Sequence, residues 1–289
     1  ELGYPQMGTY EDLLEVMADM QAIAGVSDSG KKVYAFSLFK DWDSAMIHLP
    51  YYTYLWRGET DMVTESAEVF VAYLKYLRTR VDEQGLLHIG LGDWCHTEVK
   101  KPQAPLAVTD TIVSMDTASK MAVLLEAVGK TAEAAYARGE SALYREAIRT
   151  HLVDFSTMLV AGECQTSQAM ALYYGVFDEA EKQAAFAQLL ALIDECDGRM
   201  DLGVLGGRVI FHVLAEYGYA DLAWSMIVEQ GHPSYGDLAR RGATTLWESF
   251  YPENAHWNPP SLNHHFWGDV SAWFIKAVAG ISVAPVGGG

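Results

Sequence analysis

Apolar residues recur at helical spacing along almost the whole chain, and this pattern constrains the fold more than any other feature of the sequence. In residues 116–128 one helical face is formed by Ala118, Met121, Ala122, Leu124, Leu125 and Val128. Similar segments predict helices at 9–24, 44–57, 60–81, 109–128, 131–152, 165–175, 178–196, 205–217, 219–230 and 267–280. Stretches that could be extended, such as 33–39 and 158–161, have no hairpin partner with turn chemistry. The sequence therefore predicts an all-α fold.

The predicted helices form pairs joined by short turns, and the pairs alternate with longer, aromatic-rich segments. The long segments are 25–43, 86–108, 198–204 and 231–266. In a ring of helical hairpins the short turns lie on one face and the long loops on the other, where they can carry function. A closed toroid and an open solenoid both fit this spacing, but the polar capping repeats that a solenoid needs are not evident. No Pro- or Ser-rich linker divides the chain, so residues 1–289 are expected to form one domain.

Charge and cysteine content exclude several classes of protein. The formal net charge is −18 at pH 7, and no basic stripe exists to neutralise phosphates, so nucleic acid is not an expected partner. The three cysteines lie far apart without C-x-x-C spacing, which argues against a disulfide framework and a zinc site. No apolar run reaches the roughly 18 residues of a membrane span, so no membrane contact is expected. None of these features indicates a cellular compartment.

Tryptophan and acidic residues occur together in the long loops. Three such groups are Asp41-Trp42-Asp43, Asp93-Trp94 and Trp247-Glu248, and Asn263 to Trp267 adds two histidines. Indole rings stack on the apolar faces of sugars, while carboxylates and amides bind the hydroxyls of a small ligand. Each residue alone has a simpler explanation, because loop tryptophans often cover a core and an aspartate before a helix is often an N-cap. Their coincidence on one predicted rim favours a ligand site.

Glu248 is the most informative of these acids because Trp247 and Phe250 flank it. Apolar surroundings disfavour the charged form of a carboxyl group and raise its pKa. Chains keep such a group where it is paired or where a proton must move.

Other chemistries are less well supported. His264 and His265 are adjacent and lack the i, i+4 spacing of helical metal ligands, and no third ligand is evident, so no metal is expected. Gly206-Gly207 lacks the following Lys-Ser/Thr of a phosphate loop, and no Ser or Cys lies in a nucleophile elbow. No cofactor is therefore expected.

Several segments together resemble the catalytic domain of the α-L-rhamnosidases, glycoside hydrolase family 78. They are DWDSAMIHLPYYTYLWRGETDM (41–62), GLGDW (90–94), CQTSQAMALYYGVF (164–177), DLGVLGGRVIFHVLAEYGYADLAWSMI (201–227), HPSYGDLARRGATTLWESF (232–250) and SLNHHFWGDVSAWFIKAVAGI (261–281). The resemblance runs from about residue 9 to 282. It implies an (α/α) toroid of six helical hairpins, so that residues 1–289 would be a single six-hairpin glycosidase-like catalytic domain.

The same resemblance implies a reaction and a set of site residues. Members of this family release terminal α-L-rhamnose with inversion, so the expected partner is a carbohydrate substrate, such as a glycoside or a pectic oligosaccharide. The glutamate of the TTLWE motif, Glu248, would be the general base. The positions that would line the sugar pocket are Asp41, Trp42, Asp93, Trp94, Trp247 and His264. An inverting pair of carboxyl groups stands about 6.5–9.5 Å apart, which leaves room for a water molecule.

The sequence departs from the family pattern at its start. The family's general acid lies in a Cys-Pro-x-Arg-Glu-Arg-Leu-Gly-Trp type segment, of which only Glu1-Leu2-Gly3-Tyr4 has a counterpart. The first hairpin is therefore expected to be missing or altered, and the accessory β-domains of the family are absent from this chain. Glu1 is the candidate acid, although its own α-ammonium group would lower the pKa of its carboxyl group. Asp43 stands where glycine is more familiar.

Two other functions remain open at this point. The chain could be a sugar-binding or catalytically impaired protein that keeps the pocket but lacks the acid. It could also be a polysaccharide lyase on a helical toroid, although a lyase needs a basic clamp for uronates, and the net charge of −18 weighs against one.

Overall fold

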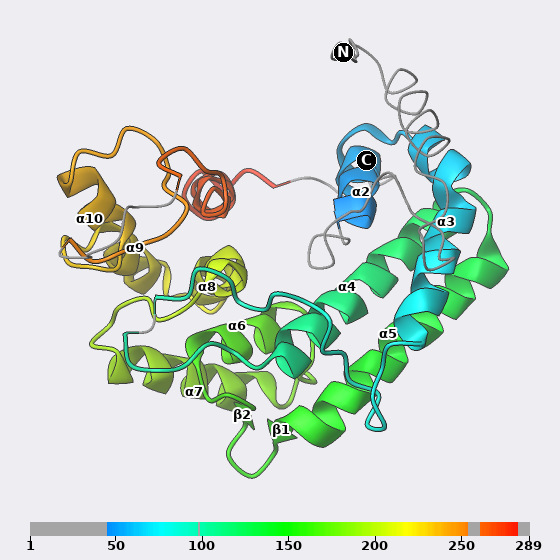
Figure 1. The fold of residues 1–289 in the computed structure, drawn as a ribbon, viewed down its shortest axis with the longest axis horizontal. Coiled ribbons are helices and arrows are strands. Elements are labelled where there is room, and N and C mark those ends of the chain that lie inside the picture. Colours follow the sequence, from blue (N-terminus) through cyan, green and yellow to red (C-terminus); the bar gives the residue numbers. More distant parts are fainter. Residues whose placement is uncertain (1–44, 98, 254–260, 283–289) are drawn as a thin grey trace, which may run out of the picture. The chain divides into compact units, whose positions relative to one another are not determined.

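A computed structural model describes residues 45–97, 99–253 and 261–282, all within one compact unit, Ser44–Gly289. The helix predicted at 9–24 lies outside the described residues, as do Glu1, Asp41, Trp42 and Asp43. Helices dominate the described part of the chain (Figure 1), which confirms the all-α prediction.

Apart from α10, which the sequence did not predict, the described helices follow the predicted order, with shifts in their ends (Figure 1). They are α2 (Ala45–Arg57), α3 (Asp61–Arg78), α4 (Leu106–Ala127), α5 (Thr131–Leu152), α6 (Gln165–Tyr173), α7 (Lys182–Glu195), α8 (Val204–Glu216), α9 (Ala220–Val228), α10 (Tyr235–Arg240) and α11 (Asp269–Trp273). A π-helical turn, η1 (Phe274–Val278), continues α11. Two short strands, β1 (Val153–Asp154) and β2 (Leu159–Val160), pair antiparallel between α5 and α6, so the stretch 158–161 has a hairpin partner that the sequence did not predict. No helix within the described ranges is long and apolar enough to cross a membrane.

Helix α4 shows how local sequence determines an element and its ends. Its apolar positions are buried on almost every side, because neighbouring helices cover it all round. The helix ends at Ala127, one residue before its predicted end, and Gly129 follows at φ +76°, a left-handed conformation that suits glycine. The predicted start was three residues late: the helix begins after Pro105, and Thr109 and Asp110 lie inside it. The Asp110 carboxylate instead accepts a hydrogen bond from the Gly90 amide at 2.7 Å.

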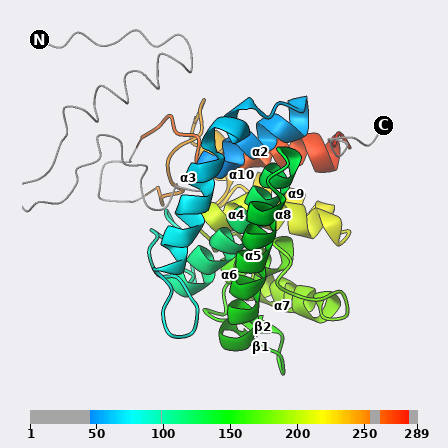
Figure 2. The ribbon, with the colours of Figure 1, turned by 90° about the vertical axis from the view of Figure 1, so that its right-hand side faces the viewer.

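The helices pack as hairpins in two layers. Sequential pairs contact each other along the chain: α2 with α3, α4 with α5, α6 with α7 and α8 with α9. The first helices of these hairpins also contact one another, in the order α2, α4, α6, α8 and then α11. In Figure 2, α3 and α5 lie in front of α4 on the outer side. The described connections before α4 and α8 enter these helices at their N-terminal ends, and the connection before α4 bonds the start of α8.

Candidate active site

Two of the long connections meet in a hollow of about 450 Å³. The connection before α4 contributes Trp94, Cys95, His96, Thr97 and Gln103, and the connection after α10 contributes Glu248, Ser249, Phe250, Tyr251 and Pro252. This volume lies within the range of small-molecule sites in proteins. The structure thus brings together Trp94 and Glu248, which the sequence predicts to share a site although they lie far apart in the chain.

Asp93 lies beneath this hollow and is fully buried. Its carboxylate accepts hydrogen bonds from three backbone amides at the start of α8: Gly203 at 2.6 Å, Leu205 at 2.9 Å and Gly206 at 3.1 Å. The hydroxyl of Thr166 on α6 donates a further hydrogen bond. Helix N-termini carry unpaired amides and a partial positive charge, which a carboxylate satisfies. Burial raises the pKa of Asp93, and the bonds from Thr166 and the α8 amides oppose that rise.

The sequence predicts that Asp93 lines the sugar pocket, and in the structure its carboxylate bonds the amides at the N-terminus of α8. Both carboxylate oxygens are occupied by the N-terminus of α8, so a ligand could reach Asp93 only by breaking these bonds. The sequence signal, an acid next to a tryptophan, does not distinguish the two roles. Asp93 holds the Gly92–Cys95 turn against α8, and the carbonyl of Trp94 accepts from the Val204 amide at 2.9 Å. Trp94 is 45% exposed and lines the hollow.

Glu248 is half-buried and held at several atoms. Its backbone amide donates to the Ser261 carbonyl at 2.9 Å, and its Oε2 accepts from the Ser261 amide at 2.9 Å. The indole Nε1 of Trp267 donates to the Glu248 carbonyl at 3.0 Å. Trp267 in turn packs on α8 where Gly207 has no side chain, because a Cβ there would stand 2.6 Å from its ring. The other carboxylate oxygen, Oε1, has no hydrogen bond from the described residues.

Trp247 lies beside the hollow and not in its wall. It is 9% exposed, and its ring stacks on Tyr251 with centroids 5.4 Å apart and an interplanar angle of 17°. The guanidinium carbon of Arg241 lies 5.0 Å from the Trp247 ring centroid. In the described residues, Trp247 therefore packs beneath the segment that carries Glu248.

His264 belongs to the segment 261–264, which forms backbone hydrogen bonds with residues 246–248. Its amide donates to the Leu246 carbonyl at 2.8 Å, two residues before Glu248. Its Nδ1 accepts a hydrogen bond from the Phe266 amide at 3.2 Å. Because Nδ1 accepts, the neutral ring carries its proton on Nε2, which can donate to a ligand hydroxyl.

The remaining predicted residues, Glu1, Asp41 and Trp42, lie outside the described part of the chain. Among the described residues that line the hollow, Glu248 is the one carboxylic acid. Sequence analysis did not single out Cys95, Thr97, Gln103, Ser249, Tyr251 or Pro252, and their closeness to Trp94 and Glu248 in the chain was the signal that could have found them. It also missed Asp201, whose buried carboxylate accepts from the amides of Val99, Lys100 and Lys101 and so anchors the wall that contains Gln103.

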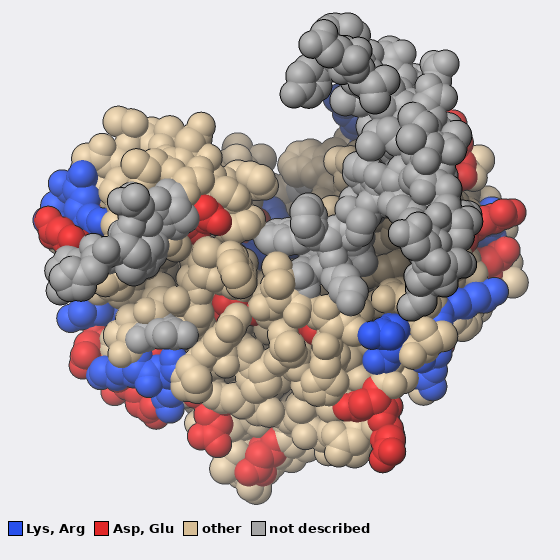
Figure 3. All heavy atoms as spheres, viewed as in Figure 1, with Lys and Arg blue, Asp and Glu red and all other residues tan. Residues whose placement is uncertain are grey.

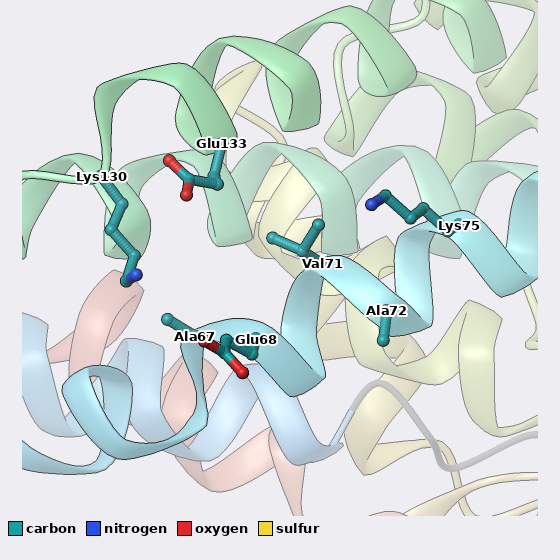
Figure 4. A pocket seen from close by; sticks show the side chains of 7 residues that line it. All are labelled: Ala67, Glu68, Val71, Ala72, Lys75, Lys130 and Glu133. Carbon is teal, nitrogen blue, oxygen red and sulfur yellow. The ribbon is translucent and has the colours of Figure 1, made fainter.

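A second hollow of about 220 Å³ lies between α3 and the start of α5 (Figure 4). Its walls carry Glu68 and Lys75 from α3 and Lys130 and Glu133 from the other side. Charges of both signs and no aromatic ring line it, so it has none of the sugar-binding features of the first hollow. On the face seen in Figure 3, acidic and basic side chains form small mixed groups toward the edge.

Comparison with known proteins places this geometry in context. Residues 4–278 match the model of the bacterial alpha-L-rhamnosidase 6 hairpin glycosidase domain. An alpha-L-rhamnosidase of Streptomyces avermitilis is 30% identical over 253 residues, which cover 85% of this chain and 24% of that protein. The crystal structure of the Streptomyces avermitilis alpha-L-rhamnosidase complexed with L-rhamnose superposes with a TM-score of 0.78 at 26% identity, covering 94% of this chain and 27% of the other.

The structure of an alpha-L-rhamnosidase from Dictyoglumus thermophilum gives a TM-score of 0.80 at 25% identity, covering 96% of this chain and 32% of that one. These likenesses confirm the predicted toroid of helical hairpins. The chain spans about a quarter of the length of the curated relatives that it matches.

Proposed function

The chain belongs to the bacterial alpha-L-rhamnosidase six-hairpin glycosidase family, and on that basis we propose that it is an inverting glycoside hydrolase that releases terminal α-L-rhamnose. The substrates would be glycosides or pectic oligosaccharides. One observation carries the proposal: Glu248 and Trp94 line the same hollow, in a chain similar to a rhamnosidase solved with L-rhamnose.

Glu248 is the proposed general base. Two hydrogen bonds to its oxygen atoms restrain this residue. The Ser261 amide donates to Oε2, and the Trp267 indole donates to the main-chain carbonyl of Glu248. Oε1, which has no hydrogen bond from the described residues, is the oxygen proposed to accept a proton from water. A base needs both properties, since it must be oriented and must keep an unoccupied acceptor within reach of the water.

The proposed reaction is a single displacement at the anomeric carbon. The oxygen of a water molecule bonds to that carbon while Oε1 of Glu248 takes its proton. The bond to the leaving oxygen breaks, and a carboxylic acid donates a proton to that oxygen. Glu1 is the candidate for this acid within the chain. Inversion follows because the water and the leaving group occupy opposite faces of the sugar.

Other residues would bind the sugar. The exposed indole of Trp94 offers a flat face for the ring, and Nε2 of His264 offers a donor for a hydroxyl. Asp41 and Trp42 complete the proposed pocket by family resemblance. Trp247 stacks on Tyr251 in the segment that contains the base. Asp93 positions the neighbouring Trp94 because its carboxylate is bonded to the N-terminus of α8.

The test is hydrolysis of p-nitrophenyl α-L-rhamnoside by the 289-residue chain and by Glu248→Gln. We expect the substitution to lower kcat by about 10²–10⁴-fold, as is typical when a general base is removed. Glu253→Gln is the matched control, because Glu253 lies five residues away with a 71% exposed side chain. Proton NMR of the first sugar formed should show the β anomer. Equal kcat values for the two variants would refute the role of Glu248, and an initial α anomer would refute inversion.

A sugar-binding or catalytically impaired protein is the second candidate, because Glu248 is the one acid among the described residues that line the hollow. An alkyl rhamnoside needs a protonated leaving oxygen, whereas an activated aryl rhamnoside needs little help. Turnover of the aryl substrate without the alkyl one would identify a missing acid. Binding of L-rhamnose in calorimetry without any turnover would identify a binding protein.

A further inference from the structure

We propose that Arg241 is a positioning residue for Glu248. It contacts both ends of the segment Trp247–Tyr251, which contains Glu248. This inference rests on the proposed role of Glu248 as general base, and it adds a residue that neither the motif nor the walls of the hollow point to.

Arg241 is itself firmly anchored at the end of α10. Its side chain is 9% exposed, and Nη1 lies 3.4 Å from Oδ2 of Asp237, whose side chain is 3% exposed. The Asp237 amide donates to the hydroxyl of Ser234, the N-cap of α10, at 2.8 Å. The main chain of Asp237 is therefore fixed at the start of α10, and its buried carboxylate contacts the Arg241 guanidinium.

From this anchor Arg241 reaches both ends of the segment. Its Nη1 donates to the main-chain carbonyl of Tyr251 at 2.6 Å. Its guanidinium carbon lies 4.5 Å from the ring centroid of Tyr251 and 5.0 Å from that of Trp247. The two rings stack on each other, so the cation holds them as one unit. Glu248 lies between them in the chain, so a shift of this unit would displace the backbone of Glu248.

Two other side chains of the described residues donate to the main chain of this segment. His232 contacts the Phe250 carbonyl through Nε2 at 3.2 Å, and Trp267 donates to the Glu248 carbonyl at 3.0 Å. Neither contacts the rings of Trp247 and Tyr251 that flank the base. A displacement of about 1 Å in a catalytic group can cost roughly 10²-fold in rate, so loss of Arg241 should be visible in kcat.

Arg240 provides a matched control. It pairs with the same aspartate, Asp237, at 2.6 Å and also with Glu253, but its side chain is 43% exposed. Its Nε donates to the carbonyl of Gln230, outside the segment. Arg240→Met therefore removes one cation from Asp237 and leaves the contacts to Trp247 and Tyr251 in place.

The experiment compares Arg241→Met with Arg240→Met in the 289-residue chain, with p-nitrophenyl α-L-rhamnoside as substrate. We expect kcat to fall about 10–100-fold for Arg241→Met and to stay within about twofold for Arg240→Met. Added azide should restore the Arg241→Met rate more than the Arg240→Met rate. Azide attacks the anomeric carbon as a preformed anion, forming a C–N bond as p-nitrophenolate leaves, so it needs no base. A merely structural defect would not respond to azide.

Hydrogen exchange gives a readout that does not depend on activity. Backbone amides of residues 247–251 should exchange faster in Arg241→Met than in Arg240→Met. If Arg241→Met does not fold, Arg241→Lys is compared with Arg240→Lys in the same way, because lysine keeps the charge but not the planar fork.

The outcomes distinguish a failure of the role of Arg241 from a failure of the proposed role of Glu248 as general base. Equal kcat and equal exchange in the two arginine variants, with Glu248→Gln impaired, would overturn the role of Arg241 alone. A low kcat in Arg241→Met that azide does not raise would do the same. Wild-type activity in Glu248→Gln would instead refute the proposed base, and the inference with it.

Discussion

The carboxylate of Asp93 accepts a hydrogen bond from the backbone amide of Gly203 at 2.6 Å, although 110 residues separate them in the chain. This bond joins the turn that carries Trp94 to the N-terminus of α8, the helix on which Trp267 packs. Trp267 then supports the carbonyl of Glu248. The N-terminal part of α8 thus determines how Trp94 and Glu248 lie relative to each other.

The approach at Gly203 leaves no room for a side chain. A Cβ there would stand 2.2 Å from the Asp93 carbonyl oxygen and 2.6 Å from that of Trp94, both rigid backbone atoms. We expect Gly203→Ala to lower the free energy of unfolding by about 1–3 kcal/mol, measured by urea denaturation. The same variant should weaken L-rhamnose binding, because Trp94 must move.

Gly139 is the matched control for that substitution. It lies within α5, and the position that a Cβ would take there is open space, so alanine should raise stability by about 0.5–1 kcal/mol through helix propensity. If Gly203→Ala were as stable as wild type, the close approach of α8 to the Trp94 turn would be refuted.

Trp94 should contribute to binding and little to stability, because its indole is 45% exposed. We expect Trp94→Ala to weaken L-rhamnose binding about three- to tenfold in calorimetry, in line with the energy of an aromatic stacking contact. Trp224 on α9 is 47% exposed and does not line the hollow, so Trp224→Ala should leave the affinity unchanged. Equal affinities for the two variants would remove Trp94 from the sugar site.

Local signals were enough to predict most helices but not all of their ends. The end of α4 lies within one residue of the predicted end at 128, next to Gly129, whose left-handed conformation suits few other residues. Helix α10 was missed because six residues are too few to show a helical period, although Ser234 caps its start. The helix predicted at 267–280 proved to be a short α-helix that continues as a π-turn. Apolar spacing does not distinguish these two helix types over so few residues.

The candidate site was harder to predict because its contacts are not local. Two of the three acid–tryptophan groups lie in segments that line the hollow, and the third lies outside the described residues, but none of them reveals what each acid does. Asp93 is buried because its partners, the amides of α8, are contributed by a distant segment. Arg241 gave no signal at all, since its role depends on the placement of Asp237 and Tyr251 in space.

The outer layer contains an ion pair that predicts acid sensitivity. Hydrogen bonds from Arg149 on α5 hold the pKa of Glu181 at about 2, below its ordinary value of 4.5. Because the folded pKa is lowered, the stabilisation is present above pH 4.5 and is lost as the pH falls toward 2. Glu181→Gln should cost at most about 1 kcal/mol at pH 7, since solvent screens a pair near the surface.

That cost should shrink to nothing near pH 2 in urea titrations at several pH values. Glu179→Gln is the control, because Glu179 pairs with Lys182 through a 90% exposed side chain and should show no such dependence. A cost that stays constant between pH 5 and pH 2 would contradict the pairing of Glu181 with Arg149.

Cys95 reports on the charge of Glu248 independently of catalysis. Burial, with the negative charges of Glu248 and Asp93, raises the pKa of the Cys95 thiol to about 11. The reactive thiolate is therefore scarce at pH 8, and iodoacetamide should label Cys95 slowly. Glu248→Gln removes one of these charges, so labelling should accelerate, by about tenfold for each unit by which the pKa falls. Peptide mass spectrometry measures the rate, and Glu253→Gln serves as the control. Equal labelling rates in the two variants would place Glu248 away from the wall that Cys95 shares with Trp94.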